Sequence, residues 1–223
     1  MPAPAAFVLD FNGTVSDDEP LLAEIYGELF AGIGLDVSGT RYQEEFAGLS
    51  DPAIVARGIA LAGRTSEPGL AERLVAGYTA RYLERVRAQS PITRDAAAIV
   101  RAAAARVPVA IASGAPRETV EAVLDGAGLR SLFTAIVTSE DVVRGKPDPE
   151  PYLTALARLD GDLSADAVWV VEDATVGVIS ARAAGMRVVA LRTPAYDADL
   201  APADLVVDRL DAQLVDRLFS ENA

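Results

Sequence analysis

The stretch FVLDFNGTVSDDEP, residues 7–20, joins a short apolar run to a carboxylate. The run Phe7-Val8-Leu9 stops at Asp10, and the chain then turns at Gly13. An apolar run of this length bounded by a turn signal is typical of a buried strand. A strand that ends in a carboxylate delivers that group to the edge of a sheet, and Asn12 places an amide beside it.

Further short apolar or β-branched runs end in small or acidic residues. Together with the first run they predict strands at residues 6–11, 107–114, 134–141, 167–173, 187–192 and 204–210. Helical patterns lie between them, at residues 118–126, 150–159 and 176–184, and the Ala-rich segment 95–106 is a further predicted helix. Near-continuous apolar strands that alternate with helices predict an α/β fold, with a Rossmann-like parallel sheet covered on both faces.

Residues 17–90 differ from the rest of the chain because they show only helical periodicity. Glycines at positions 48, 58 and 63 are predicted to break this segment into separate helices. A helical insertion therefore interrupts the α/β fold directly after its first strand. The expected division is a core of residues 1–15 and 91–223 and a helical domain of residues 16–90.

Composition excludes several classes of function. A formal charge of −13 and a pI near 4.4 argue against a nucleic-acid or anionic-membrane partner. No apolar run approaches the roughly 18–20 residues of a membrane span, and the N-terminus lacks a cationic segment, so a cytoplasmic location is expected. The chain has no His and no Cys, which excludes Ser-His and Cys-His nucleophiles and thiolate or imidazole metal sites. The remaining chemistry uses carboxylates, hydroxyls, cations and a hard metal such as Mg²⁺.

Polar residues stand at the ends of the predicted strands. Ligands of open parallel sheets bind outside the carboxyl ends of the strands. These ends carry Asp10 and Asn12, Ser113-Gly114, Ser139 with Lys146 just beyond, and Glu172-Asp173. Carboxylates, a hydroxyl beside a helix start and one ammonium together predict a metal–phosphate site.

Four motifs resemble those of the haloacid dehalogenase-like superfamily, in its branch of phosphatases and β-phosphoglucomutase-like enzymes with a helical cap inserted after the first strand. They are DFNGT at 10–14, ASG at 112–114, GKPDPEPY at 145–152 and VVEDATVGVISARAAGM at 170–186. SDDEP at 16–20 resembles the usual start of the cap. The resemblance implies a Mg²⁺-dependent phosphohydrolase that acts on a small phosphorylated metabolite, as a monomer or homodimer.

The resemblance also assigns roles at the metal end of the site. Asp10 is the expected nucleophile, which forms an aspartyl-phosphate that water then hydrolyses. The expected Mg²⁺ ligands are the carboxylates of Asp10 and Asp173, the backbone carbonyl of Asn12, and Glu172 directly or through water. A backbone ligand does not depend on the side chain at position 12.

Other residues are expected to hold phosphate and substrate. Ser113 with the N–H groups of Gly114 and Ala115 binds phosphate oxygens at a helix start, Lys146 bridges nucleophile and phosphate, and Thr14 orders the loop. Arg117 is either a phosphate or substrate ligand or a solvated residue of the first helical turn. In the cap, Gly48, Leu49 and Ser50 resemble the loop that reaches into the site, and Arg57 and Arg81 are candidates for a second anionic group.

Lys146 is the only lysine beside 19 arginines. An ammonium is a compact point charge that a guanidinium cannot replace in a crowded site, so its retention supports a site role. The cap has no lysine, which excludes the family's phosphonate-cleaving members with their cap Schiff base. The acidic pair Glu172-Asp173 disfavours the metal-free dehalogenases.

Asn12 departs from the family pattern. Phosphatase members carry a second aspartate here, which protonates the leaving alcohol and then deprotonates the attacking water. An amide cannot exchange that proton. Three explanations stay open: a substrate with a good leaving group or its own proton, a slow or inactive phosphate-binding sensor, or a substitution introduced to trap a complex. A phosphomutase is the alternative activity within the same class.

Overall fold

The computed structural model describes residues 3–38, 40–159, 161–192 and 202–220. Within them, six parallel strands form one sheet in the order β3-β2-β1-β4-β5-β6. The strands are β1 (Ala6–Leu9), β2 (Val109–Ala112), β3 (Ala135–Val137), β4 (Val168–Glu172), β5 (Arg187–Leu191) and β6 (Leu205–Val207). The predicted strands are therefore confirmed, although each is shorter than its apolar run.

Both faces of the sheet are buried, which explains the continuous apolar runs. In β1, Phe7 and Leu9 belong to one hydrophobic cluster, whereas Ala6 and Val8 belong to another on the opposite face. Successive side chains of a strand point to opposite faces, so an unbroken apolar run fills two cores at once.

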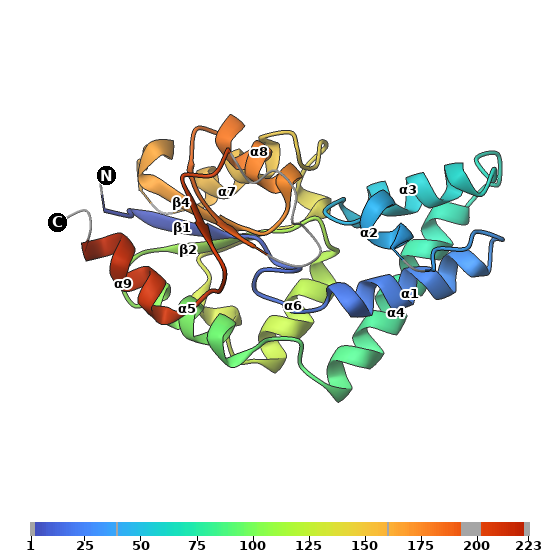
Figure 1. The fold of residues 1–223 in the computed structure, drawn as a ribbon, viewed down its shortest axis with the longest axis horizontal. Coiled ribbons are helices and arrows are strands. Elements are labelled where there is room, and N and C mark those ends of the chain that lie inside the picture. Colours follow the sequence, from blue (N-terminus) through green and yellow to red (C-terminus); the bar gives the residue numbers. More distant parts are fainter. Residues whose placement is uncertain (1–2, 39, 160, 193–201, 221–223) are drawn as a thin grey trace.

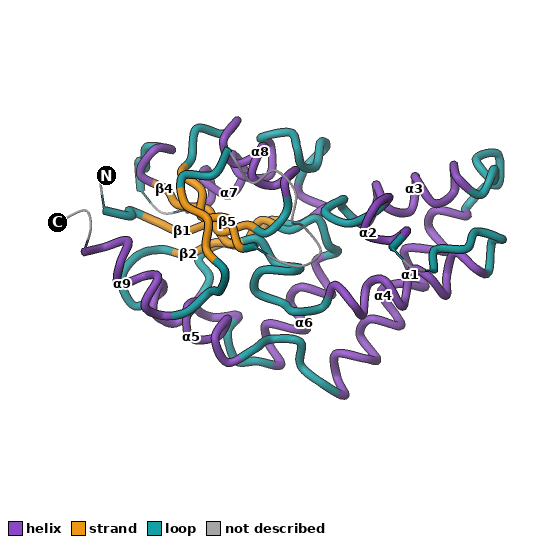
Figure 2. The backbone as a smooth tube through the Cα atoms, in the orientation of Figure 1, coloured by secondary structure: helices purple, strands orange, loops and turns teal. Residues whose placement is uncertain are grey.

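Helices cover the two faces separately (Figures 1 and 2). One face is covered by α5 (Arg94–Ala104), α6 (Arg117–Gly126) and α9 (Ala212–Ser220), and the other by α7 (Glu150–Arg158) and α8 (Thr175–Ala183). Three short 3₁₀ turns, η1 (Arg130–Leu132), η2 (Ser139–Asp141) and η3 (Ala165–Ala167), lie in the connections. No helix within these described ranges is long and apolar enough to cross a membrane.

The helical insertion forms a cap beside the sheet (Figure 1). It consists of α1 (Glu19–Ala31), α2 (Arg41–Glu45), α3 (Asp51–Leu61) and α4 (Leu70–Ala88). Buried aromatic rings hold these helices together, since Tyr26 of α1 stacks on Tyr78 of α4 with 4.9 Å between ring centroids. The domain boundaries at residues 15–16 and 90–91 stay predictions.

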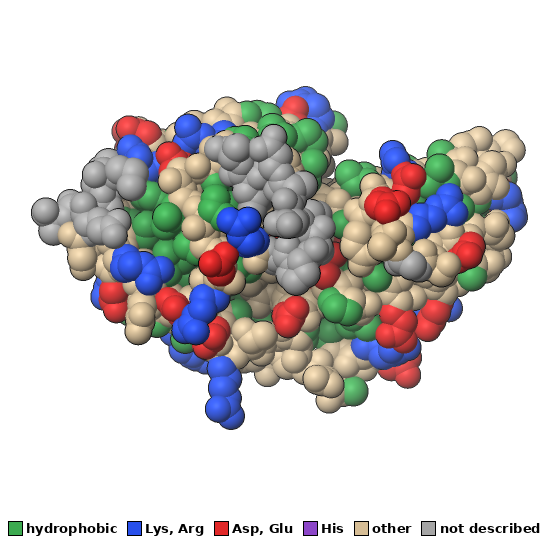
Figure 3. Space-filling model, in the orientation of Figure 1, with side chains coloured by type: hydrophobic (Ala, Val, Ile, Leu, Met, Phe, Trp, Pro, Cys, Tyr) green, Lys and Arg blue, Asp and Glu red, His purple; other side chains and the backbone are tan. Residues whose placement is uncertain are grey.

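Ionic contacts cover the outside of the cap. On the face drawn in Figure 3, basic and acidic side chains are interspersed over these helices. Arg85 of α4 pairs with Glu24 of α1 at 2.8 Å, and both side chains are about half exposed. Exposed pairs of this kind contribute little stability. The aromatic interior therefore holds the cap together more than its surface charges do.

Two details of the sequence prediction are wrong. Residues 139–141 are not strand but a 3₁₀ turn, because Thr138 and Asp141 form a reciprocal capping box there. Gly58 does not break a helix but lies inside α3. A Cβ at this position would lie 2.3 Å from the Phe30 ring, so Gly58 allows α1 and α3 to pack closely.

Candidate active site

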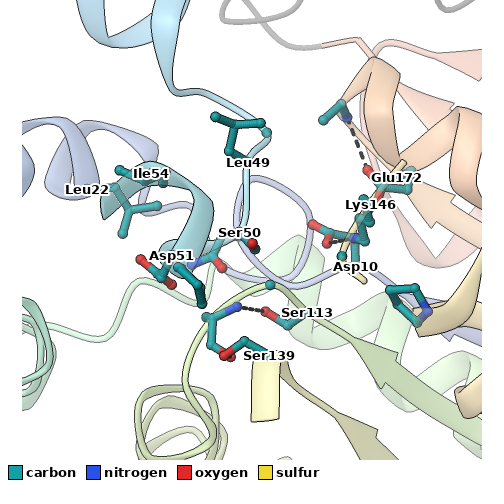
Figure 4. Close-up of a pocket in the computed structure, with 18 of the residues that line it drawn as sticks. Asp10, Leu22, Leu49, Ser50, Asp51, Ile54, Ser113, Ser139, Lys146 and Glu172 are labelled. Atoms are coloured by element: carbon teal, nitrogen blue, oxygen red, sulfur yellow. Dashed lines mark hydrogen bonds and ion pairs between the residues drawn. The ribbon is translucent and has the colours of Figure 1, made fainter. Parts of the chain in front are cut away.

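The strand order places the polar strand ends at one point. The order reverses at β1, because β2 and β3 lie on one side of it and β4 to β6 lie on the other. Ligands of doubly wound sheets bind at such a switch point, outside the carboxyl ends of the strands. Asp10 follows β1, Ser113 follows β2 and Glu172 ends β4, and all three line the same cavity (Figure 4).

Lys146 joins two of the carboxylates. Its ammonium donates hydrogen bonds to Asp10 Oδ1 and, at 2.6 Å, to Glu172 Oε1. Tyr152 O–H donates to the same Glu172 oxygen at 2.6 Å. The side chains of Lys146 and Asp10 are each only 10% exposed. The lone lysine of the chain is therefore a largely buried member of this site and not a surface charge.

The other oxygen of Glu172 is held by the backbone. Glu172 Oε2 accepts the N–H groups of Asp173 at 3.0 Å and Ala174 at 3.1 Å. These two N–H groups lie just before α8. The carboxylate therefore also accepts hydrogen bonds from backbone groups at the start of this helix. Four hydrogen bonds thus fix the carboxylate of Glu172 in one orientation.

Negative charge exceeds positive charge in this cluster. Burial and the Glu172 carboxylate raise the pKa of Asp10 to about 7, although Lys146 opposes the shift. Burial, Asp10 and Glu172 raise the pKa of Asp173 well above its ordinary value. Burial opposes the charge of Lys146, but Asp10 and Glu172 outweigh it and raise the pKa of the ammonium. Additional positive charge would stabilise the ionised carboxylates.

The donor set fits a hard divalent cation. One oxygen each of Asp10, Glu172 and Asp173 lies within 4.8 Å of the others, and all three residues are buried. Carboxylate oxygens are the ligands that Mg²⁺ prefers. The residues present are therefore chemically suited to the ion that the sequence predicts.

Glycines allow these side chains to approach the backbone. Gly13 has a positive φ of 79°, and a Cβ there would lie 2.1 Å from Asp173 Oδ2. A Cβ at Gly177 would lie 1.8 Å from Glu172 Oε1. Thr14 Oγ1 donates to Asp173 Oδ1 at 3.2 Å. The Gly13-Thr14 turn after β1 therefore positions the carboxylate of Asp173, the residue that directly follows β4.

The loop after β2 lies against a loop of the cap. Ser113, Gly114 and Ala115 line the cavity, and the N–H of Ala115 donates to Ser113 Oγ at 3.0 Å. The N–H of Asp51 donates to the carbonyl of Gly114 at 3.1 Å. A Cβ on Gly114 would meet Ser50 Cα at 2.7 Å. The structure therefore brings Gly48, Leu49 and Ser50 of the cap, which also line the cavity, to this loop.

Three arginines predicted as candidate anion ligands lie away from the cavity. The Arg117 guanidinium pairs with Asp141 and, at 3.3 Å, with Glu121. Arg57 pairs with Glu45, and Arg81 lies 3.4 Å from Glu28. None of the three lines the cavity, and each has a carboxylate partner elsewhere.

The Asn12 side chain is bound to a buried carboxyl. Its Nδ2 donates to Asp18 Oδ2 at 2.9 Å, and Ser16 and Tyr82 hydroxyls donate to the same oxygen. Asp18 is 1% exposed, and burial raises its pKa to about 6. Asn12 also lines the cavity, so its amide connects the site to the start of the cap.

Sequence reasoning found Gly48, Leu49 and Ser50 on the cap side of the cavity but missed three other cap residues. Glu19, at the start of α1, Tyr42 of α2 and Asp51, at the start of α3, all line it. They are not strand ends, so the rule that found Asp10 and Glu172 does not find them. The available signals were the SDDEP motif, which contains Glu19, and the predicted cap loop, which Asp51 directly follows.

The structure is thus an α/β sheet with an inserted helical cap and an acidic site at its switch point. The model of the haloacid dehalogenase-like hydrolases matches residues 4–185. The chain belongs to this family and is a hydrolase, as its motifs predict.

Individual relatives agree with the family. The chain is 32% identical over 207 residues to validoxylamine A 7'-phosphate phosphatase of Streptomyces hygroscopicus subsp. limoneus, covering 91% of this chain and 92% of the relative. It is 29% identical to hexitol phosphatase B of Escherichia coli, covering 85% and 84%. A solved structure of β-phosphoglucomutase from Clostridium difficile matches with a TM-score of 0.84 at 18% identity, over 98% of each chain. At 18% identity, this last likeness shows the fold alone.

Proposed function

We propose that this hydrolase is a Mg²⁺-dependent phosphatase that cleaves a small phosphorylated metabolite through an aspartyl-phosphate on Asp10. The observation that carries the proposal is the position of Lys146, which lies largely buried between Asp10 and Glu172, beside Asp173. One ammonium among three carboxylates suits a site that also receives a metal ion and a phosphate. The phosphatase names of the two relatives above support the same reaction.

The proposed metal ligands are the carboxylates of Asp10, Glu172 and Asp173 and the backbone carbonyl of Asn12. When bound, Mg²⁺ supplies positive charge that offsets phosphate repulsion and keeps the carboxylate of Asp10 ionised. Lys146 supplies the protein's own positive charge at the same place. Its bond to Asp10 also directs one oxygen of that carboxylate.

In the first step an Asp10 carboxylate oxygen attacks phosphorus and forms an acyl phosphate bond. The bond between phosphorus and the ester oxygen breaks, and its electron pair leaves with that oxygen. The Ser113 hydroxyl and the N–H groups after β2 hold the phosphoryl oxygens, while Lys146 balances their charge. In the second step a water oxygen attacks phosphorus and the bond between phosphorus and the Asp10 oxygen breaks. Inorganic phosphate leaves with the two protons of the water, and the Asp10 carboxylate is restored.

Asn12 limits which substrates this mechanism can serve. Its amide can donate or accept a hydrogen bond but cannot give a proton to the leaving oxygen or take one from water. The proposed substrate therefore has a leaving group that departs without a proton, or supplies the proton itself. A phosphomutase is less suited to this site because it needs proton transfer in both directions. A phosphate-binding protein without turnover is the second candidate, and Asn12 is the observation that favours it.

Hydrolysis of p-nitrophenyl phosphate tests the proposal, because nitrophenolate leaves without a proton. We expect turnover with Mg²⁺, loss of turnover in excess EDTA, and less than about 1% of it in the Asp10→Asn variant. Full activity in EDTA, or in Asp10→Asn, would contradict the mechanism. Tight phosphate binding without turnover in the unmodified protein would instead support the binding function.

A further inference from the structure

The cavity has two chemically different ends. Its volume is about 210 Å³, and it lies between the core and the cap (Figure 4). The core end carries the proposed phosphate site, with Asp10, Ser113 and Lys146. The cap end is lined by apolar side chains, including Leu22 and Ile54, and by the polar side chains of Glu19, Tyr42 and Asp51.

Positive charge is confined to the core end. Among the described residues, Lys146 is the only Lys or Arg that lines the cavity, and its ammonium is already bonded to two carboxylates. The segments outside the described ranges contain no Lys or Arg in their sequence. The three arginines that the sequence suggests as anion ligands pair with carboxylates outside the cavity. They are Arg57, Arg81 and Arg117. A second anionic group on a substrate would therefore meet no cationic side chain.

Carboxyl groups with raised pKa values gather at the cap end. Burial, together with Asp18 and Asp10, raises the pKa of Glu19 to about 8. Burial raises the pKa of Asp51 to about 7, with Asp18 adding to the shift and the Tyr26 hydroxyl opposing it. Within the described chain, the Glu19 side chain has no hydrogen bond or ion pair, while the Asp51 side chain accepts a hydrogen bond from Tyr26. Glu19 is thus free to bind a group of the substrate.

These carboxyls can bind a hydroxyl in either protonation state, and an ammonium when they are ionised. When protonated, a carboxyl donates a hydrogen bond to a hydroxyl, and when ionised it pairs with an ammonium. A cation in the cavity also lowers the pKa of its neighbours and stabilises their ionised forms. A carboxylate or second phosphate has the opposite effect, because like charges repel in a partly desolvated cavity.

We propose that the cap end selects phosphate monoesters whose remaining part carries hydroxyl or ammonium groups and no second anion, with Glu19 as the residue that binds them. This inference rests on the proposed phosphatase function and deepens it. It disfavours bisphosphates and phosphorylated carboxylic acids as substrates. It also disfavours a mutase cycle, which passes through a bisphosphate.

Three sugar phosphates of similar size test this selection at about pH 7. They differ in the charge of the part away from the phosphate. Glucosamine 6-phosphate carries an ammonium there, glucose 6-phosphate carries only neutral hydroxyls, and 6-phosphogluconate carries a carboxylate. We expect kcat/KM for the first two to exceed that for 6-phosphogluconate at least tenfold. An equal or higher kcat/KM for 6-phosphogluconate would overturn the inference, while turnover of p-nitrophenyl phosphate by the same sample keeps the phosphatase function.

Glu19→Gln tests the residue itself. We expect it to lower kcat/KM for glucosamine 6-phosphate at least threefold and to narrow the advantage of this substrate over 6-phosphogluconate. Glu72→Gln, at an exposed position in α4, should leave the ratio unchanged. An unchanged ratio in Glu19→Gln would remove Glu19 from substrate recognition.

Binding measurements test this inference independently of the phosphatase proposal. Calorimetric titration of Asp10→Asn with the same three compounds measures selection without turnover. Tighter binding of glucosamine 6-phosphate than of 6-phosphogluconate supports the inference even where the parent protein hydrolyses none of them. The reverse order contradicts it even where the parent is an active phosphatase.

Discussion

Asn12 and Asp18 are in direct contact at the start of the cap, with 2.9 Å between the amide nitrogen and the carboxyl oxygen. Asp18 has a pKa raised to about 6 by burial, and Ser16 and Tyr82 also donate to it. A carboxyl at position 12 would face this buried carboxyl. Two carboxyls in contact share a proton, because they cannot both ionise at low cost. Position 12 is therefore well placed to hold an exchangeable proton if it is given an acidic side chain.

Asn12→Asp should increase the hydrolysis of alkyl phosphates at least tenfold. General acid–base catalysis typically contributes about 10²–10⁴-fold, and an alkyl alcohol needs a proton as it leaves. Aryl phosphates should gain less, and only as far as hydrolysis of the aspartyl-phosphate limits the rate. Steady-state kinetics of both proteins on phenethyl phosphate and p-nitrophenyl phosphate measure the two effects. Equal rates on the alkyl substrate would mean that position 12 is not the acid–base position.

Close packing inside the cap depends on one glycine of α3. A Cβ at Gly58 would lie 2.3 Å from the ring of Phe30, whereas a Cβ at Gly27 of α1 has nothing within 4 Å. The two glycines lie in neighbouring cap helices but differ in their surroundings. They therefore separate the effect of packing from that of helix propensity.

Gly58→Ala should destabilise the protein, and Gly27→Ala should stabilise it. Overpacking costs about 1–3 kcal/mol, while replacing a helical glycine by alanine gains up to about 1 kcal/mol. We expect a net loss of about 1 kcal/mol for Gly58→Ala and a gain of about 0.5–1 kcal/mol for Gly27→Ala. Urea denaturation gives both free energies of unfolding. A gain for Gly58→Ala equal to that for Gly27→Ala would show that Phe30 moves aside without cost.

The arrangement of the strands and helices explains why part of this site could be predicted from the sequence. Asp10, Ser113 and Glu172 each follow or end an apolar run, and the carboxyl ends of parallel strands meet at one edge of a sheet. Local sequence therefore predicts their proximity, and Lys146 adds a compositional signal. Their chemical roles remain predictions. Glu19 and Asp51 could not be placed, because each stands at a helix start in the cap and reaches the cavity only through contacts between distant helices.

The same reasoning applies to the misread details of the fold. The apolar run of 134–141 predicts a strand to its end, but the capping box between Thr138 and Asp141 competes locally and turns the chain. Gly58 resembles a helix break because an isolated glycine weakens a helix. Its close contact with Phe30, 28 positions away along the chain, is a tertiary effect that helical periodicity does not contain.

At the scale of the whole molecule, cap and core share one hydrophobic cluster. It includes Phe7 and Leu9 of β1 together with Tyr26 of α1 and Tyr78 of α4. Helix α4 of the cap also packs against α6 of the core. We therefore expect the protein to unfold in one cooperative transition, so that a change in the cap alters the stability of the whole chain.

Asp51 should make this global stability depend on pH. It is 5% exposed, and burial raises its pKa from 3.8 to about 7. Between these values the folded state keeps a proton that the unfolded state has lost, so stability falls as pH rises through this window. One pKa unit corresponds to about 1.4 kcal/mol, so full ionisation costs the folded state on the order of 4 kcal/mol.

Asp51→Asn removes this titration and keeps an acceptor for the Tyr26 hydroxyl. The variant should therefore be more stable than the parent by an amount that grows with pH, about 2–3 kcal/mol larger at pH 8 than at pH 5. Urea denaturation of both proteins in EDTA at the two pH values measures this difference. The parent and variant at pH 5 serve as the internal control, because most of the Asp51 population is still protonated in the folded parent. A difference that is the same at both pH values would mean that Asp51 ionises without cost, and that the cap end of the cavity is more hydrated than its burial indicates.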